Sequence, residues 1–279
     1  MKSLFSLISV LIMSFIPHSQ GFNLPELPTD NGDGFIVIAH RGASAYAPEN
    51  TLSSFRLAVE MKAEMMELDV SLSKDGIPVV IHDETVDRTT DANGAVSDFT
   101  IDDLKALETG AWFSEEFAGE PFPTLLEVLS EVKGEIAVNI EIKSEAVKNT
   151  AEGGIVEKCL QIVRTLGIEK NIIFSSFDYR VMDHLNELAP DLPKAILYEE
   201  SQSGNLLPSE LVKKYKVDAF NFSHRQFSQE WEDDLKVHGI PFFIYTVNEE
   251  KLMKELIERG ATGIFSDKPD VLKSVVENL

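Results

Sequence analysis

The chain has 279 residues and a formal net charge of −22, with 47 acidic and 25 basic side chains. This acidic excess repels nucleic acids and anionic membranes, so we expect neither as a partner. The single cysteine, Cys159, excludes an internal disulfide, and the fold must therefore rest on its apolar core.

The first residues have the pattern of a secretory signal peptide. Met1-Lys2-Ser3 gives a basic start, residues 4–16 are apolar, and small or polar residues follow up to Gly21. The apolar run is shorter than the roughly 20 residues of a membrane span, which disfavours the alternative of an anchor. We expect removal of residues 1–21 and export to the periplasm or the medium, without stable membrane insertion. Residues 22–34 are rich in Pro, Gly, Asn and Asp, and we expect an exposed lead-in there.

Apolar runs of strand length then alternate with helical patterns along the chain. Strands are expected at 35–39, 65–70, 136–142, 171–176, 194–198, 217–222, 241–246 and 263–266. Helices are expected at 52–61, 125–132, 155–166, 179–188, 209–215, 229–238, 249–258 and 270–278. This alternation predicts an α/β fold, the (β/α)8 TIM barrel, and its usual length of about 250 residues fits a single domain over 22–279. Cys159 falls in a helical stretch and is expected to be buried. The sequence indicates no oligomeric state.

One segment interrupts the alternation after the second strand. Lys74-Asp75-Gly76 is a turn signal, and residues 71–82 are expected to form a hairpin that returns from this strand. Residues 83–124, approximately, then form a long insertion before the next helix. Loops of this length in compact domains are usually functional, so we expect the insertion to cover the substrate, with Trp112 and Phe113 touching it.

Two histidines stand at ends of expected strands. His40 ends the first strand and is followed by Arg41 and Gly42, and His82 ends the hairpin. A single histidine at such a place is more often structural, but two that flank acidic residues favour general acid–base catalysis. Three other histidines lie on or beside helices without a cluster of partners, and we expect them at the surface: His184, His224 and His238.

Acidic side chains follow the same pattern on two strands. Glu67 and Asp69 point to one side of the second strand, and Glu141 shares a face of the third strand with Asn139 and Lys143. Carboxylates crowded on an otherwise apolar strand repel each other, and a divalent cation resolves that repulsion. Ligands that are all oxygen favour a hard ion, Ca²⁺ or Mg²⁺. The alternatives are two solvated acids at a strand edge and a structural Glu141–Lys143 ion pair.

Together these motifs resemble the glycerophosphodiester phosphodiesterase family over residues 36–270. The matching segments are His40-Arg41-Gly42, Glu67-Leu68-Asp69-Val70, Ile81-His82-Asp83 and Asn139-Ile140-Glu141-Ile142-Lys143, with 48–52, 87–90, 175–177, 245–248 and 263–267. The resemblance implies a barrel with an insertion after the second strand. It also implies metal ligation by Glu67, Asp69 and Glu141, and acid–base roles for His40 and His82.

The resemblance further implies phosphate contacts by Arg41 and Lys143. Glu49 is expected to reach the same site, and Phe177 and Tyr245 to contact the substrate. Many relatives have tryptophan where this chain has Tyr245, which puts the shape of the apolar wall in question.

The implied reaction is hydrolysis of small glycerophosphodiesters, such as glycerophosphocholine, to glycerol 3-phosphate and an alcohol. Either water or the substrate's own 2-hydroxyl is the nucleophile, and the acid and base histidines are not distinguished. An alternative on the same barrel is a phospholipase D-like or phosphoinositide-cleaving enzyme, which the acidic charge disfavours. A non-catalytic binding protein is a third reading, but no histidine or carboxylate of the set is missing.

Overall fold

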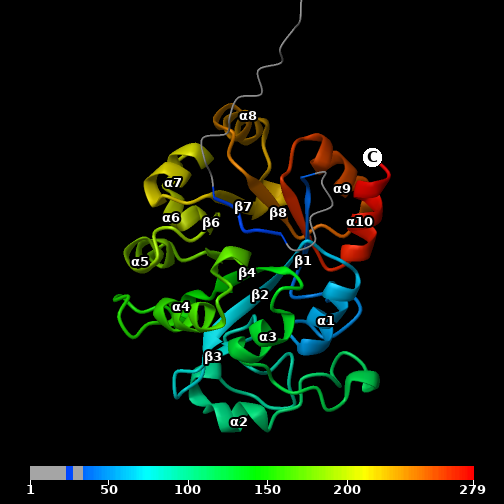
Figure 1. The fold of residues 1–279 in the computed structure, drawn as a ribbon, viewed down its shortest axis with the longest axis vertical. Helices are drawn as coiled ribbons and strands as arrows, with labels where there is room; N and C mark the ends of the chain where they lie inside the picture. The colour runs from blue at the N-terminus through cyan, green and yellow to red at the C-terminus, as the bar shows by residue number, and fades with distance from the viewer. Residues whose placement is uncertain (1–22, 28–33) are drawn as a thin grey trace, which may run out of the picture.

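The computed structural model describes residues 23–27 and 34–279, so the expected signal peptide at 1–21 lies outside the described residues. Eight parallel strands close into a barrel, because β1 pairs with both β9 and β2 (Figure 1). The prediction of a (β/α)8 barrel is therefore confirmed. The barrel strands are β1 Ile36–Ala39, β2 Met65–Leu72, β4 Ala137–Ile142, β5 Ile172–Ser176, β6 Lys194–Leu197, β7 Ala219–Ser223, β8 Phe242–Tyr245 and β9 Gly263–Ser266.

Helices surround the barrel and bury one face against it. Thr51 and Thr124 begin α1 and α3 with capping boxes, in which each hydroxyl accepts from the third residue of its helix. Cys159 is buried on α4 as expected, and burial raises the pKa of its thiol. The main helices are α1 Leu52–Glu60, α3 Leu125–Val132, α4 Ile155–Leu166, α5 Arg180–Leu188, α7 Pro208–Tyr215, α8 Gln229–His238, α9 Glu250–Glu258 and α10 Pro269–Glu277, with a short unpredicted α6 at Glu200–Ser203. None of the helices described here has the length and apolar character that a bilayer crossing needs.

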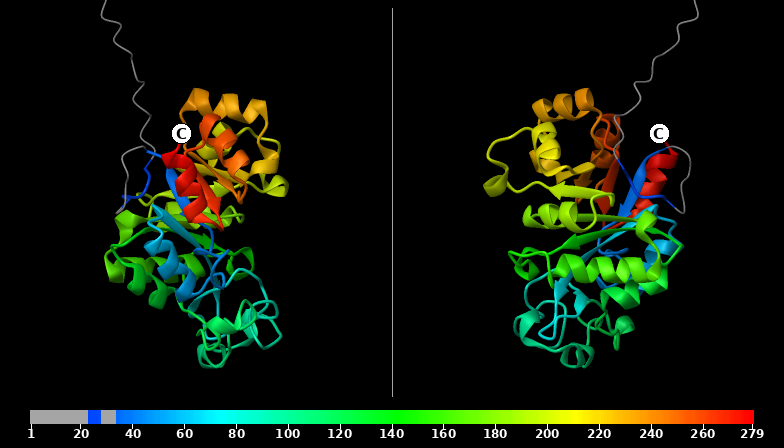
Figure 2. Two further views of the ribbon diagram at one scale, coloured as in Figure 1. Left: turned by 90° about the vertical axis from the view of Figure 1, so that its right-hand side faces the viewer. Right: turned by 60° about the vertical axis from the view of Figure 1, so that its left-hand side comes forward.

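The insertion forms a small unit of its own beside the barrel. The expected hairpin is present, since β3 Pro78–Val80 runs antiparallel to β2 with Val80 opposite Val70. Figures 1 and 2 show the segment that follows, including α2 Ile101–Lys105, at one end of the molecule. It has a separate apolar core, made by Val79, Ile81, Val86, Val96, Leu104 and Phe122.

Residues 23–27 are not an exposed lead-in, and this expectation was wrong for them. Leu24 and Leu27 pack on the apolar cluster inside the barrel, and Pro25 is buried. The Asn23 N–H donates to Asp218 Oδ1 at 3.0 Å, and the Glu26 N–H donates to the Lys170 carbonyl at 2.7 Å. Both partners precede barrel strands, so the segment closes the end opposite the strand C-termini.

Removing this closure is expected to lower stability without touching the site. The double variant Leu24→Ala, Leu27→Ala should lose roughly 2 kcal/mol of unfolding free energy, since both side chains are only partly buried. For a chain of this size, that is a fall in melting temperature of about 4 to 8 °C, measurable by circular dichroism. Val237→Ala is the control, because Val237 on α8 is 80% exposed. An unchanged melting temperature in the double variant would contradict the packing role.

Candidate active site

The end of β1 makes a sharp turn that only certain residues accept. Arg41 has φ 54° and Gly42 has φ 80°, both in the left-handed region. A Cβ at Gly42 would lie 2.6 Å from the backbone carbon of Ser54, so glycine is required there. The turn aims the Arg41 N–H at Glu67, where it donates to Oε2 at 2.8 Å.

Three carboxylates meet at the C-terminal ends of β2 and β4. Asp69 lies opposite Glu141 in the parallel pairing, and Glu67 is one step earlier on the same face of β2. One oxygen from each of the three side chains falls within 4.8 Å of the others. Burial, and then repulsion by Asp69, raises the pKa of both Glu67 and Glu141. The sequence expectation that these three side chains converge is met by the geometry.

This cluster fits a hard divalent cation. All three side chains offer oxygen, which Ca²⁺ and Mg²⁺ prefer, and a bound cation would offset the crowding that raises the two glutamate pKa values. The Glu141–Lys143 ion pair considered as an alternative is also present, with Lys143 Nζ 2.8 Å from Glu141 Oε1 and 3.2 Å from Asp69 Oδ1. Burial raises the pKa of Asp69, but Lys143 and Arg41 outweigh it and hold that pKa below its usual range.

Asn50 has a role that the sequence did not reveal. The residue that caps α1 is Thr51, not its neighbour Asn50. Asn50, at φ 58°, instead donates from Nδ2 to Asp69 Oδ2 at 2.9 Å and accepts the Asp69 N–H at 3.2 Å. This pair of hydrogen bonds fixes the orientation of the Asp69 carboxylate.

Each strand-end histidine is held by a carboxylate. His40 Nδ1 lies 2.7 Å from Asp267 Oδ1, and His82 Nδ1 lies 2.6 Å from Asp83 Oδ1. With Nδ1 engaged, the Nε2 atom of each ring is the one available for proton transfer. Asp267 belongs to the matching segment 263–267, and its position directly after β9 is the sequence signal for a partner of His40.

The two histidines share one cavity of about 190 Å³ with Glu67 and Glu141. Its lining combines five charged or titratable side chains, His40, Arg41, Glu67, His82 and Glu141, with Ser175, Phe177, Leu197, Tyr245, Thr246 and Phe265. Phe177 and Tyr245 meet edge to face with ring centroids 6.0 Å apart. The cavity therefore offers a ligand both charged groups and apolar surface. Glu49 reaches the site indirectly, by accepting from Arg41 Nη1 at 2.8 Å.

Two expectations about other side chains do not hold. Among the described residues, neither Trp112 nor Phe113 lines this cavity; the Trp112 indole donates to the Thr109 carbonyl and its ring packs on Phe113. His184 is buried on α5, not at the surface, because it lies on the apolar face of that helix. His238 is exposed as expected, whereas His224 is partly buried.

The Asp267 carboxylate should make stability depend on acid pH. Burial raises its pKa, but hydrogen bonds from His40, Asn248 and Ser44 outweigh it and lower the pKa to about 2. An unfolded aspartate titrates near 3.9, so this stabilisation is complete above about pH 4 and is lost as the pH falls through 2. In urea unfolding at a series of acid pH values, Asp267→Asn should show a shallower loss of stability than the unmodified protein. Equal slopes would contradict the assigned interaction.

The fold and the site together define a TIM-barrel hydrolase suited to phosphate esters. The cationic side chains of Arg41 and Lys143 lie at the C-terminal ends of the strands, together with three carboxylates and two oriented histidines. Barrels of this type carry their active sites at this end.

Comparison with known proteins identifies the family. The model of the Glycerophosphoryl diester phosphodiesterase family matches residues 40–271. A glycerophosphodiester phosphodiesterase of Caldanaerobacter subterraneus subsp. tengcongensis is 39% identical over 242 residues, covering 86% of this chain and 97% of the relative. Another from Bacillus subtilis is 35% identical over 256 residues and covers 87% of each chain. The chain belongs to the glycerophosphoryl diester phosphodiesterase family and is a phosphoric diester hydrolase.

Solved structures agree with this assignment. A phosphodiesterase of Oleispira antarctica, in complex with the product sn-glycerol-3-phosphate, is 30% identical with a TM-score of 0.79, covering 86% of this chain and 96% of its own. A glycerophosphodiester phosphodiesterase of Agrobacterium tumefaciens is 27% identical with a TM-score of 0.75, covering 86% and 99%.

Proposed function

We propose that this protein hydrolyses glycerophosphodiesters to glycerol 3-phosphate and an alcohol, with Ca²⁺ or Mg²⁺ held by Glu67, Asp69 and Glu141. The observation that carries the proposal is the convergence of these three carboxylates within 4.8 Å, beside two histidines that each have a carboxylate partner. The likeness to a phosphodiesterase solved with glycerol 3-phosphate supports the product.

The side chains divide the chemistry between them. A bound cation would supply positive charge to a phosphate oxygen. Arg41 and Lys143 bind the phosphate and stabilise the charge that builds up on it as the new bond to phosphorus forms. One histidine accepts the proton of the nucleophile at Nε2, and the other donates a proton to the oxygen of the departing alcohol. The nucleophile is water or the substrate's 2-hydroxyl.

The apolar residues of the cavity limit the size of the alcohol group that a small diester can carry. Phe177, Leu197 and Tyr245 line the same cavity as the charged residues. Tyr245 is smaller than tryptophan, so the wall leaves more space than a tryptophan at this position would.

A substrate comparison tests the proposal. Choline release from glycerophosphocholine and from phosphatidylcholine vesicles should be measured with the same enzyme preparation. Turnover of the water-soluble diester alone is expected. The second candidate, a lipid-cleaving enzyme, rests on Trp112, which is 39% exposed at the surface of the insertion beside Phe113. Preferred cleavage of the vesicles would replace the proposed substrate with a lipid.

We also propose that the protein is exported and loses residues 1–21. The basic start and the short apolar run of the first residues support this. N-terminal sequencing of the protein recovered outside the cytoplasm should begin at Phe22. Recovery of only the full-length chain from the cytoplasm would contradict export.

A further inference from the structure

Arg88, from the insertion, binds two carboxylates at once. Its Nε donates to Asp83 Oδ2 at 2.7 Å and its Nη2 to Asp83 Oδ1 at 3.1 Å. Its Nη1 and Nη2 donate to Glu49 Oε2 and Oε1 at 2.7 and 2.8 Å. A planar guanidinium can hold two carboxylates in this forked manner, whereas a lysine ammonium cannot.

Each of these two carboxylates also forms a hydrogen bond with a residue of the active site. Asp83 Oδ1 holds His82 Nδ1 at 2.6 Å, and Glu49 Oε1 accepts from Arg41 Nη1 at 2.8 Å. Arg88 itself is not among the residues that line the catalytic cavity. A continuous chain of hydrogen bonds therefore runs from His82 to Arg41 and passes through Arg88.

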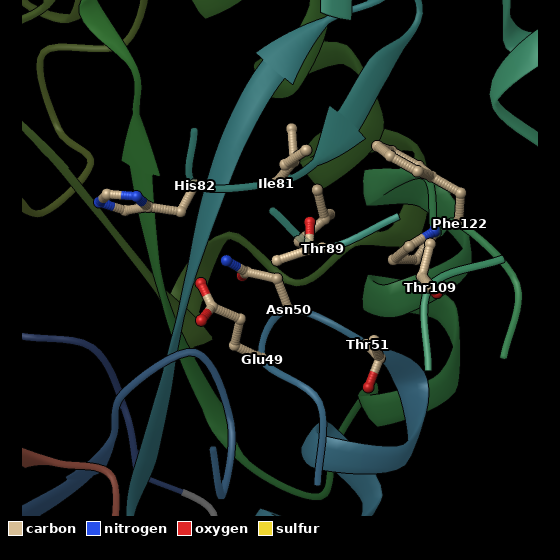
Figure 3. Close-up of a pocket in the computed structure, with 10 residues that line it drawn as sticks. Glu49, Asn50, Thr51, Ile81, His82, Thr89, Thr109 and Phe122 are labelled. Atoms are coloured by element: carbon tan, nitrogen blue, oxygen red, sulfur yellow. The ribbon is translucent and has the colours of Figure 1, made fainter. Parts of the chain in front are cut away.

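The insertion fixes where Arg88 stands. Val86 is buried in the small core of the insertion, and its backbone N–H donates to the Gly94 carbonyl at 3.0 Å. Thr90 Oγ1 donates back to the Val86 carbonyl at 2.8 Å. A second, smaller pocket lies between the barrel and the insertion, next to the catalytic cavity. Figure 3 shows this pocket, with His82, Glu49 and Asn50 at one side and Thr109 and Phe122 at the other. The folded insertion thus fixes the backbone near Arg88, whose side chain reaches Glu49 of the barrel domain.

The charges along this chain alternate. Arg41 and Arg88 are cations, and Glu49 and Asp83 are the anions between and beside them. The hydrogen bonds from Arg88, with that from His82, outweigh burial and lower the pKa of Asp83 to about 2. Asp83 is therefore ionised and can accept from the histidine near neutral pH. Loss of Arg88 would leave two neighbouring carboxylates without their common partner.

We infer that Arg88 is a positioning residue, which orients His82 through Asp83 and Arg41 through Glu49, so that the insertion completes the catalytic machinery. The inference rests on the proposed function, because it assigns His82 to proton transfer and Arg41 to phosphate binding. It gives the insertion a role in the rate of the reaction, in addition to any role in covering the substrate.

A double-mutant cycle tests the inference. Arg88→Gln should lower kcat roughly tenfold to a hundredfold, as partners that orient catalytic groups typically do, and should raise KM several-fold through Glu49 and Arg41. In an Asp83→Ala background the link to His82 is already cut and only the route through Glu49 and Arg41 remains. The same change should therefore lower kcat several-fold less than in the unmodified protein, while the effect on KM persists. Arg88→Lys should recover only part of the loss. Arg56→Gln is the matched control, since Arg56 on α1 makes one surface ion pair, with Glu131.

Two readouts separate positioning from a purely structural role. Millimolar guanidinium should restore part of the kcat of Arg88→Gln and should not raise that of the Arg56→Gln control. Equal loss of kcat in both backgrounds, or unchanged kcat per folded molecule with a lower melting temperature, would overturn the inference. Bis(p-nitrophenyl) phosphate is run beside glycerophosphocholine. If the unmodified enzyme cleaves only the synthetic diester, the proposed substrate fails, and the cycle on that diester still tests Arg88.

Discussion

Removal of divalent cations is expected to abolish turnover of glycerophosphocholine, and added Ca²⁺ or Mg²⁺ is expected to restore it. The physical reason is the site itself, because Glu67 and Asp69 are almost fully buried and only 12% of the Glu141 side chain is exposed. Arg41 and Lys143 neutralise part of this charge, but in the proposed reaction both side chains also bind the phosphate. Protein dialysed against a chelator should be assayed with and without each ion.

Stability gives an independent readout of the same site. A cation that binds only the folded chain raises the melting temperature, so the temperature should rise with added ion in the unmodified protein. Glu67→Gln and Glu141→Gln should weaken this rise and lose most of the rate. Glu131→Gln is the control, because Glu131 pairs with Arg56 at the surface. Full activity in excess chelator after prolonged dialysis would contradict the assignment of a metal site.

Replacement of either strand-end histidine by alanine is expected to lower the rate by roughly 10² to 10⁴-fold, the usual contribution of a positioned acid or base. His40 and His82 both line the catalytic cavity, and each has Nδ1 engaged by an aspartate. Each ring can therefore present only Nε2 to the reacting atoms. Steady-state kinetics and circular dichroism of both variants provide the measurement.

His238→Ala is the matched control for these variants. His238 also has a carboxylate neighbour, since its Nδ1 lies 3.2 Å from Asp234 Oδ1, but its side chain is 53% exposed on α8. This variant should keep the full rate. Near-normal turnover in His40→Ala or His82→Ala would return that histidine to a structural role.

The sequence predicted the parts of the site that depend on strand periodicity. Glu67 and Asp69 are two residues apart, so any strand places them on one face, and parallel strands in a barrel bring their C-terminal ends together. His40 could be predicted in the same way from its place at the end of an apolar run. Glu141 could be predicted as a site residue because polar and apolar side chains alternate along its strand, which gives the strand one polar face.

The remaining features depend on contacts between distant segments, which composition does not encode. Residues 23–27 have the composition of an exposed linker, yet two leucines among them pack against the apolar cluster inside the barrel. Arg88 lies within the matching segment 87–90, but nothing local pairs it with Glu49, which is 39 residues away. Trp112 looked like a substrate contact because it is aromatic, but its neighbours in the insertion decide where it packs.

Phosphorus NMR of a glycerophosphocholine digest tests the central claim most directly. Enzyme loaded with Ca²⁺ or Mg²⁺ should convert the diester signal to that of glycerol 3-phosphate, with one choline released for each phosphate. This result requires cleavage of the ester link between the phosphate and choline, and not of the link between the phosphate and glycerol. Phosphocholine as the product, or an unchanged diester signal with the metal-loaded enzyme, would contradict the account.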